Sequence, residues 1–279
     1  MRAREVLVTG ARGKTGREVV AQLTAQGITT RAGSSRTGEA AGGARRVLFD
    51  WDRPETWAAA LDGVDALYLM RPDLADAPDR VSEVVGLASH AHVVLLSEQG
   101  AGDLPDTSWE RGVERAVTDR AARWTIVRPS WFQQVLTDER YYAASIRQDG
   151  ILPLTTGGAT IAFVDARDIA AVAVAALLEP ERSTGAAYEL TGPESLSAQD
   201  VADVLTRVVG RRVEAVDVPP EDVVGGLEPA LAEVVGGVLR RVRDGVYAPV
   251  TDDVERAAGR PPFSLRAFAE EYAPVWRRP

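Results

Sequence analysis

Short apolar runs alternate with helical stretches along the first half of the chain. The runs do not alternate apolar with polar positions, which is typical of strands covered on both faces of a parallel sheet. Expected strands cover residues 5–9, 28–34, 46–51, 64–70, 92–97 and 124–128, and expected helices cover residues 15–26, 54–61, 79–89 and 109–120. This rhythm predicts an α/β fold, a doubly wound parallel Rossmann sheet with right-handed crossovers.

The regular alternation loosens after Ser130. Expected helices cover residues 141–148, 166–178 and 198–209, expected strands cover residues 162–164, 187–190 and 213–218, and the remainder reads as mostly helical. We predict a first domain over residues 1–130. A smaller mixed α/β C-terminal lobe over residues 131–279 partly crosses back to that domain.

A glycine-rich loop, T-G-A-R-G-K-T-G, joins the first expected strand to the first expected helix. In dinucleotide-binding folds the first glycine permits a tight turn, the second admits a pyrophosphate, and the third lets the helix pack closely. The amide groups at the start of the helix attract phosphate. A P-loop is excluded because its earlier glycine would fall on Val8, and a tight turn without a ligand is the remaining alternative. The predicted cofactor contacts are Gly10, Arg12, Gly13, Lys14, Thr15 and Gly16.

The end of the second strand predicts which dinucleotide is bound. An acidic residue there binds the ribose hydroxyl of NAD, whereas an arginine accommodates the 2′-phosphate of NADP. The segment from Thr30 to Arg36 holds no acidic residue. Ser35 and Arg36 are suited to bind a phosphate, and Arg31, earlier in the strand, is a weaker candidate. We predict NADP(H) in preference to NAD(H), the alternative being a solvated arginine at a strand end.

Composition and charge exclude several classes of function. The chain has 279 residues, 45% of them hydrophobic, and a net charge of −9 without a basic block, which argues against nucleic acid and anionic membranes as partners. There is no cysteine and there are only two histidines, so no metal site is predicted. The apolar run near the N-terminus, Val6 to Val8, is too short for a signal peptide core, and no stretch approaches the length of a membrane span. We expect a cytoplasmic protein whose partner is a small molecule.

Several further motifs follow the glycine loop in a specific order. They are Gly33-Ser34-Ser35-Arg36, Phe49-Asp50-Trp51, Gly63-Val64-Asp65-Ala66-Leu67-Tyr68, Trp124-Thr125-Ile126-Val127-Arg128-Pro129, Phe163-Val164-Asp165-Ala166-Arg167-Asp168-Ile169-Ala170 and Tyr188-Glu189-Leu190-Thr191-Gly192-Pro193. Together they resemble the NmrA-like group of atypical short-chain dehydrogenases/reductases over residues 5–215. The Phe-Asp-Trp stretch and the Pro-x-x-Trp after it also resemble the ergot-alkaloid reductase branch of that group.

The resemblance implies cofactor contacts beyond the loop. Asp50 and Trp51 match residues that contact adenine, although capping of a strand end is an alternative role for Asp50. Leu69, Met70 and Arg71 match the fourth-strand segment that passes under the cofactor ribose.

The resemblance also implies a substrate site. Ser97 matches the fifth-strand serine that helps to hold a substrate carbonyl and lies beside the cofactor. Ser130, Trp131 and Phe132 match the loop that flanks nicotinamide and substrate. The two aromatic rings would form an apolar wall of a pocket between the lobes, or else pack in a core. Residues 131–279 are accordingly predicted to bind substrate.

The usual catalytic pair of the wider superfamily is missing from this sequence. That pair is a tyrosine acid and a lysine four residues later, which lowers the tyrosine pKa. Lys14 is the only lysine of the chain, so no such pair exists. The corresponding helix, residues 109–120, carries Glu110, Arg111 and Glu114 instead. Ordinary ketone reduction is therefore disfavoured, because an alkoxide needs stabilisation as it forms.

Two solutions remain for the chemistry. In the first, the substrate is already an electrophile, such as an iminium, quinone or enone, which mainly needs a positioned hydride donor. Otherwise a different acid serves, and the predicted catalytic residues are Ser97 and Tyr142, with Tyr141 and Glu98 as further candidates.

We predict an NADPH-dependent reductase of a small, largely apolar electrophile. The first alternative is a non-catalytic NAD(P)-sensing regulatory protein, which the missing pair favours. The second is a non-redox cyclase or isomerase on the same fold. The apolar, glycine-broken segment from Val223 to Val242 is a candidate for a lid or for a contact helix, and the second role would form a homodimer.

Overall fold

The computed structural model describes residues 4–36 and 43–277. The chain divides into two compact units. The first unit comprises Met1–Pro129, Ala166–Leu190 and Asp253–Arg260, and the second comprises Ser130–Asp165, Thr191–Asp252 and Pro261–Pro279. Each unit is therefore assembled from segments that are far apart in the sequence.

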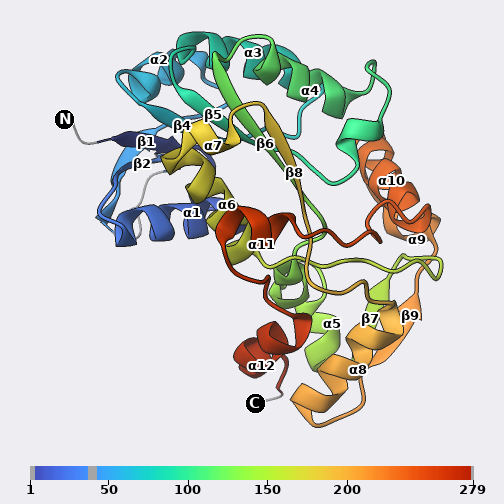
Figure 1. Cartoon of the computed structure of the whole chain (residues 1–279). Helices are drawn as coiled ribbons and strands as arrows, with labels where there is room; N and C mark the ends of the chain where they lie inside the picture. The colour runs from blue at the N-terminus through green and yellow to red at the C-terminus, as the bar shows by residue number, and fades with distance from the viewer. Residues whose placement is uncertain (1–3, 37–42, 278–279) are drawn as a thin grey trace. The chain divides into compact units, whose positions relative to one another are not determined.

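The first unit is built on a seven-stranded sheet (Figure 1). Its strands are β1 (Glu5–Val8), β2 (Thr29–Ser34), β3 (Arg45–Leu48), β4 (Ala66–Met70), β5 (His92–Leu96), β6 (Arg123–Pro129) and β8 (Ala186–Leu190). Their spatial order is β3-β2-β1-β4-β5-β6-β8, and every pair is parallel. The first six follow the order of a Rossmann sheet, so the predicted fold class is confirmed.

Helices cover both faces of this sheet. They are α1 (Lys14–Ala25), η2 (Pro54–Thr56), α2 (Trp57–Leu61), α3 (Ala77–Leu87), η3 (Ala101–Asp103), α4 (Trp109–Thr118), α6 (Ala166–Leu178), α7 (Pro180–Ser183) and α11 (Asp253–Ala258). Figure 1 shows α2, α3 and α4 on one face and α1 and α6 on the other. Leu7, Leu67 and Leu95 of the strands are fully buried beneath them. Coverage of both faces explains why the strands read as continuous apolar runs.

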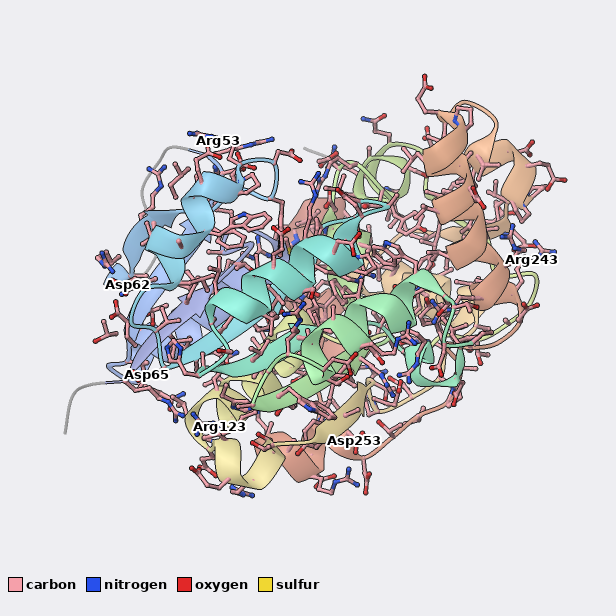
Figure 2. All side chains as sticks on the ribbon, turned by 90° about the horizontal axis from the view of Figure 1, so that it is seen from above. Arg53, Asp62, Asp65, Arg123, Arg243 and Asp253 are labelled. Atoms are coloured by element: carbon pink, nitrogen blue, oxygen red, sulfur yellow. The ribbon has the colours of Figure 1, made fainter. Side chains whose placement is uncertain are left out.

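Ion pairs and polar contacts connect the N-terminal ends of the strands, which together form the amino edge of the sheet. Asp65 precedes β4 and accepts a hydrogen bond from the Glu5 amide at 2.8 Å, and Arg123 begins β6 (Figure 2). Arg31 is buried, pairs with Glu5 at 2.6 Å and donates to the Ala60 carbonyl at 2.8 Å. Arg31 is therefore committed to the structure of this edge. The loops that follow the strands emerge from the opposite, carboxyl edge.

The second unit has its own core and a small sheet. Its elements are η4 (Gln133–Thr137), α5 (Ala143–Gln148), β7 (Ile151–Leu154), α8 (Ala198–Val209), β9 (Glu214–Asp217), α9 (Pro220–Val224), α10 (Pro229–Arg243) and α12 (Leu265–Trp276). β7 and β9 pair in parallel. Trp276 is fully buried, and its indole donates to the Leu136 carbonyl at 2.7 Å, which ties the last helix to the segment after β6.

One sequence prediction in this unit is wrong, and one strand was not predicted. Residues 162–164 do not form a strand of a sheet: Ala162 donates to the Tyr247 carbonyl at 2.8 Å and Val164 to the Trp131 carbonyl at 2.8 Å, so their backbone partners lie on different segments. These three residues are buried in the core of the unit, and their apolar character reflects this burial and not a place in a sheet. Conversely, β7 was not expected, since four residues that include Pro153 give little strand signal.

Candidate active site: a dinucleotide loop and an ion cluster

The glycine loop lies between the ends of β1 and β4, where the strand order reverses. Gly10 has a φ of +59°, and a Cβ there would meet Met70 Cε at 2.4 Å. The Gly13 amide donates to the Gly10 carbonyl at 2.8 Å, which closes the turn. A Cβ on Gly16 would lie 2.2 Å from that carbonyl oxygen. The loop therefore has the compactness that lets a pyrophosphate approach its backbone.

The first turn of α1 is open to an anion. Gly13 is the N-cap residue, no side chain caps this helix end within the described chain, and its first turn holds no acidic residue. The free amide groups and the helix dipole therefore present partial positive charge. Arg12 is exposed beside them, and Lys14 is half-buried in the first turn.

Buried polar contacts hold this loop on the sheet. The Tyr68 hydroxyl donates to Thr15 Oγ1 at 2.9 Å, and burial raises the pKa of Tyr68 well above its usual value, so the phenol stays a donor. Thr9 Oγ1 accepts a hydrogen bond from the Met70 amide at 2.8 Å. The Ala11 amide donates to the Gly33 carbonyl at 3.2 Å. These bonds fix both ends of the loop.

The end of β2 leaves Ser35 and Arg36 exposed. The backbone of Arg36 is held, because its amide donates to Ser34 Oγ at 3.2 Å and its carbonyl accepts from Arg46 at 2.7 Å. Its guanidinium meets no carboxylate among the residues for which positions are described. The predicted phosphate ligands are thus available, whereas Arg31 is not.

The segment after β3 is rigid. The Asp52 amide donates to Asp50 Oδ1 at 3.1 Å, and the Trp57 indole donates to the Asp50 carbonyl at 2.8 Å. The Trp51 ring packs edge-on against Phe49 and Trp57, with centroids 5.1 and 5.8 Å away. Asp50 therefore does form a strand-end turn, and its contact with adenine stays a prediction.

The fourth-strand residues have three different environments. Leu69 is fully buried, so only its backbone can meet a ligand. Met70 covers the glycine loop. Arg71 pairs with Asp73 at 2.6 Å and with Glu98 at 2.9 Å, and its guanidinium lies 4.4 Å from the centre of the Trp109 ring.

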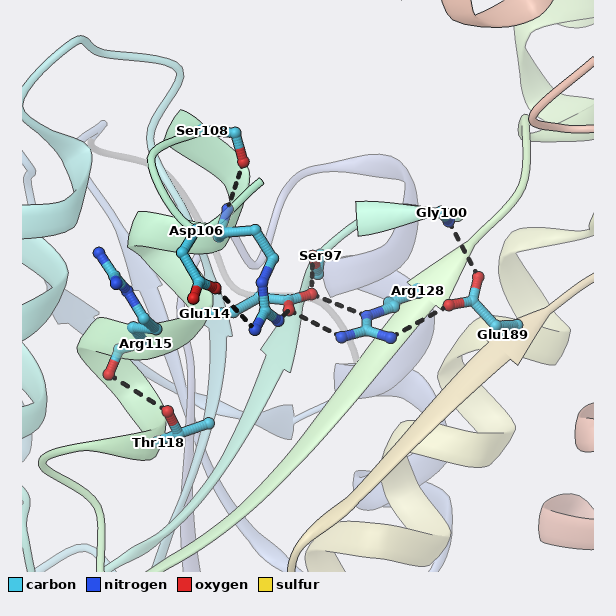
Figure 3. A network of polar contacts seen from close by, with 10 residues as sticks. Ser97, Gly100, Asp106, Ser108, Glu114, Arg115, Thr118, Arg128 and Glu189 are labelled. Carbon is cyan, nitrogen blue, oxygen red and sulfur yellow. Dashed lines mark hydrogen bonds and ion pairs between the residues drawn. The ribbon is translucent and has the colours of Figure 1, made fainter. Parts of the chain in front are cut away.

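A cluster of charged side chains, the Glu114 cluster, lies at the ends of β5, β6 and β8 (Figure 3). It comprises Ser97, Arg111, Glu114, Arg128 and Glu189. Ser97 Oγ donates to Glu114 Oε1 at 2.7 Å, Arg128 donates to both oxygens at 2.8 Å, and Arg111 donates to Oε2 at 2.8 Å. Burial raises the Glu114 pKa, but hydrogen bonds from Arg128 and Ser97 outweigh it and hold the pKa below its usual value. Glu114 is therefore a buried carboxylate.

Glu189 lies on the other side of Arg128. Its oxygens accept from Arg128 Nη1 at 3.2 Å and from the Gly100 amide at 3.1 Å, and burial raises its pKa. All three nitrogens of Arg128 are thus bonded to carboxylates. Gly102 leaves the room for this guanidinium, since a Cβ there would meet Arg128 Nη1 at 2.3 Å.

In the second unit, the predicted substrate residues begin directly after β6. Ser130 is buried, and its hydroxyl has no hydrogen-bond partner among the described residues. Trp131 packs edge-on against Phe163 and Tyr247, with centroids 6.5 and 6.3 Å away, and stays half-buried. Phe132 is also half-buried and pairs with Val164 in an isolated bridge. The Trp131 ring thus contacts the core of the second unit and keeps an exposed part, and Phe132 is also partly exposed.

The two tyrosines proposed as acids differ in exposure. Tyr142 is half-buried, and burial raises its pKa to about 12. Tyr141 is 55% exposed. A proton on Tyr142 is held firmly at neutral pH, which makes this phenol a weak acid.

A model of the NAD(P)H-binding family matches residues 10–180. Festuclavine dehydrogenase of Aspergillus fumigatus is 31% identical, over 98% of this chain and 99% of its own. The (4-alkanoyl-5-oxo-2,5-dihydrofuran-3-yl)methyl phosphate reductase of Streptomyces griseus is 34% identical, over 96% and 98%. The chain belongs to the NAD(P)H-binding family. The predicted NmrA-like atypical short-chain dehydrogenase/reductase, related to ergot-alkaloid reductases, is confirmed.

A solved structure supports the fold of this family member. The NADPH-dependent quinone oxidoreductase of Escherichia coli, in complex with NADPH, superposes with a TM-score of 0.80 at 20% identity, covering 96% of this chain and 99% of its own. The chain is an NAD(P)H-dependent oxidoreductase. No helix in the described part is long and apolar enough to cross a membrane, and no group of three or more metal-ligating side chains occurs there.

The residues present fit a nicotinamide dinucleotide. The cradle at Gly10 and Gly16 would be filled by any Cβ, and the N-terminus of α1 has no capping side chain within the described chain. Each of these features leaves a place for polar atoms that the protein itself does not supply.

Sequence reasoning missed the Glu114 cluster and Tyr68. One signal was available, because Arg128 directly follows the buried apolar residues Ile126 and Val127 of β6, and a charge at such a place requires a partner. Which carboxylates supply it depends on the packing of α4 and β8, which no local pattern reveals. Tyr68 gave no signal, since a tyrosine in an apolar strand looks like any other core residue.

Proposed function

We propose that this oxidoreductase is an NADPH-dependent reductase of a small, largely apolar electrophile: an imine or iminium, a quinone or an enone. The proposal rests chiefly on the glycine loop beneath the open first turn of α1, which is suited to a dinucleotide diphosphate. When bound, NADPH supplies the hydride. The chain's own residues bind and orient the two reactants.

The choice of NADPH is supported by the end of β2. Arg36 is exposed, its backbone is fixed, and Ser35 beside it is also exposed. A guanidinium and a hydroxyl suit a 2′-phosphate, and no acidic residue lies there to accept a bond from a 2′-hydroxyl.

The ion pairs of three arginines support this class of electrophile. The arginines lie near the ends of β4 and β6 and in the first turn of α4, and each is bonded to a carboxylate. They are Arg71, Arg128 and Arg111. They therefore offer no unpaired guanidinium to an alkoxide, which ketone reduction would create. Hydride addition to an iminium yields a neutral amine, and addition to an enone or quinone yields a delocalised anion that water can protonate.

The relatives agree with such a substrate. The name of the Streptomyces griseus reductase describes a ring alkene conjugated with an oxo group, and the Escherichia coli structure is of a quinone oxidoreductase. The half-buried rings of Trp131 and Phe132 support an apolar substrate.

The proposal is tested by measuring the consumption of NADPH with electrophilic acceptors and with simple ketones of similar size. We expect turnover with cyclic iminium ions, quinones or enones and none above background with simple ketones. Binding of NADPH without turnover on any acceptor would favour the regulatory alternative. Product formation without net oxidation of NADPH would favour the cyclase or isomerase.

Substitution of Arg36 tests the cofactor preference. Wild-type protein should bind NADPH roughly tenfold or more tightly than NADH, because charge-assisted hydrogen bonds contribute about 1.5–3 kcal/mol. Arg36→Ala should bring the two affinities close together. Arg120→Ala removes an exposed guanidinium after α4 and should leave the ratio unchanged. Equal affinities in the wild-type protein would contradict the preference.

A further inference from the structure

The Ser97 hydroxyl uses its hydrogen-bond donor but not its acceptors. Its hydroxyl proton is donated to Glu114 Oε1 at 2.7 Å, and its side chain is buried directly after β5. Among the described residues, none donates a hydrogen bond to Ser97 Oγ. The lone pairs of this oxygen therefore accept no hydrogen bond within the part of the chain that the structure describes.

Glu114 fixes the direction of this bond. Its carboxylate is 1% exposed and accepts hydrogen bonds from Arg128 Nε and Nη2 and from Arg111 Nη1, in addition to Ser97. A carboxylate held by two guanidinium groups only accepts hydrogen bonds, so Ser97 must donate to it. Ser97 cannot at the same time donate that proton to a substrate.

We propose that Glu114 is a positioning residue that fixes Ser97 Oγ as a hydrogen-bond acceptor facing an N–H donor of the bound cofactor or substrate. The inference rests on the proposed function, because Ser97 must lie beside the reactants. It changes the role expected of Ser97: this serine orients a ligand and delivers no proton. Two groups offer such a donor, the carboxamide of the nicotinamide and the nitrogen of a protonated imine.

The first experiment compares two dinucleotides. NADP⁺ carries the carboxamide, whereas its acetylpyridine analogue has an acetyl group there and no N–H donor. If the carboxamide faces Ser97, wild-type protein binds NADP⁺ roughly threefold to tenfold more tightly than the analogue, the worth of one hydrogen bond. Ser97→Ala then abolishes this preference. Glu114→Gln also abolishes it, because a glutamine amide can donate to Ser97 and reverse its bond.

The second experiment compares two substrates of equal charge. One is a cyclic imine protonated at nitrogen, and the other is its N-methylated iminium counterpart, which has no N–H. If the substrate nitrogen faces Ser97, wild-type protein favours the protonated imine by a similar factor in kcat/KM, and both variants lose this preference. Ratios of this kind are insensitive to a general loss of folded protein.

Glu5→Gln is the matched control. Glu5 is also a partly buried carboxylate bonded by two arginines, Arg31 at 2.6 Å and Arg45 at 3.2 Å, but it lies at the amino edge of the sheet. This variant should lower stability without changing either ratio. Thermal unfolding of all variants identifies any that fail to fold, and Ser97→Ala keeps the ion pairs of Glu114 intact.

The inference is overturned if Ser97→Ala and Glu114→Gln retain the wild-type ratios in both experiments, or if the wild-type protein shows no preference in either. Turnover of NADPH with an electrophile would leave the proposed function standing in that case. Conversely, the dinucleotide comparison tests Ser97 even if no acceptor is reduced.

Discussion

Gly16 has no room for a side chain. A Cβ at this position would lie 2.2 Å from the backbone oxygen of Gly10, which cannot move without opening the loop. We expect Gly16→Ala to lower the free energy of unfolding by about 1–3 kcal/mol, the usual cost of overpacking. Dinucleotide affinity should fall at least tenfold, because the amides of the loop and the first turn of α1 move together. Urea unfolding and NADPH titration measure the two effects.

Gly86→Ala provides the comparison. Gly86 lies in α3, and a Cβ there would meet no atom within 4 Å. This substitution should leave NADPH binding unchanged and stabilise the protein by up to about 1 kcal/mol through helix propensity. Wild-type affinity in Gly16→Ala would contradict the function assigned to the loop.

Single residues differ in how far the sequence reveals their function. The glycines of the loop are recognisable because their spacing expresses a local backbone requirement. Arg36 is a candidate phosphate ligand because it follows the second strand, where dinucleotide-binding folds distinguish NADP from NAD. Glu114 is not, since its partners Ser97 and Arg128 come from two other elements. A buried ion cluster becomes visible only when the packing is known.

Elements were predictable where burial and periodicity agree. α8 was expected over residues 198–209 and is found at Ala198–Val209, because its apolar residues repeat at helical spacing behind a clear N-terminal signal. Residues 162–164 were misread because burial alone made them apolar. β3 ends at Leu48, before the expected Trp51, because Asp50 starts a turn.

The N-terminal signal of α8 is testable. Ser197 Oγ accepts from the Asp200 amide at 3.2 Å, and Asp200 accepts from the Ser197 amide at 2.9 Å, which forms a capping box. Ser197→Ala should lower the free energy of unfolding by about 1 kcal/mol, whereas Ser197→Thr, which keeps a capping hydroxyl, should cost less. Urea unfolding measures the difference, and equal values for both variants would count against the box.

The free energy of unfolding of the whole molecule should fall in mild acid because of His92. This side chain is fully buried. Burial, together with the positive charge of Arg123, lowers the pKa of His92 from 6.5 to about 4. The unfolded chain therefore binds a proton that the folded chain excludes between those two values. The contribution of His92 to the free energy of unfolding is therefore fully present above pH 6.5. As the pH is lowered, the free energy of unfolding falls by about 1.4 kcal/mol for each pH unit until about pH 4.

A variant isolates this effect. His92→Gln removes the titrating group, so its stability should fall less steeply with acidification across the same window. Denaturant unfolding at several pH values gives both slopes. Parallel slopes for wild type and variant would show that His92 is not responsible.

The whole molecule was less predictable than its parts. Ala166–Leu190 and Asp253–Arg260 belong to the first unit although long segments of the second unit precede them. Their place depends on distant partners: β8 pairs with β6, and Arg260 pairs with the buried Asp168 at 2.6 Å. Such long-range pairings leave no periodic trace in the sequence.

The packing of α1 against α6 determines when the protein becomes able to bind its cofactor. α1 carries the glycine loop at its start, and its Gln22 donates to the Arg167 carbonyl at 3.0 Å on a helix encoded far downstream. During synthesis, the loop emerges early but the support behind its helix emerges only with α6. A nascent chain of the first 130 residues would leave α1 with an uncovered apolar face and β6 with an open edge. We therefore expect a chain that lacks α6 to bind the dinucleotide more weakly than the complete fold.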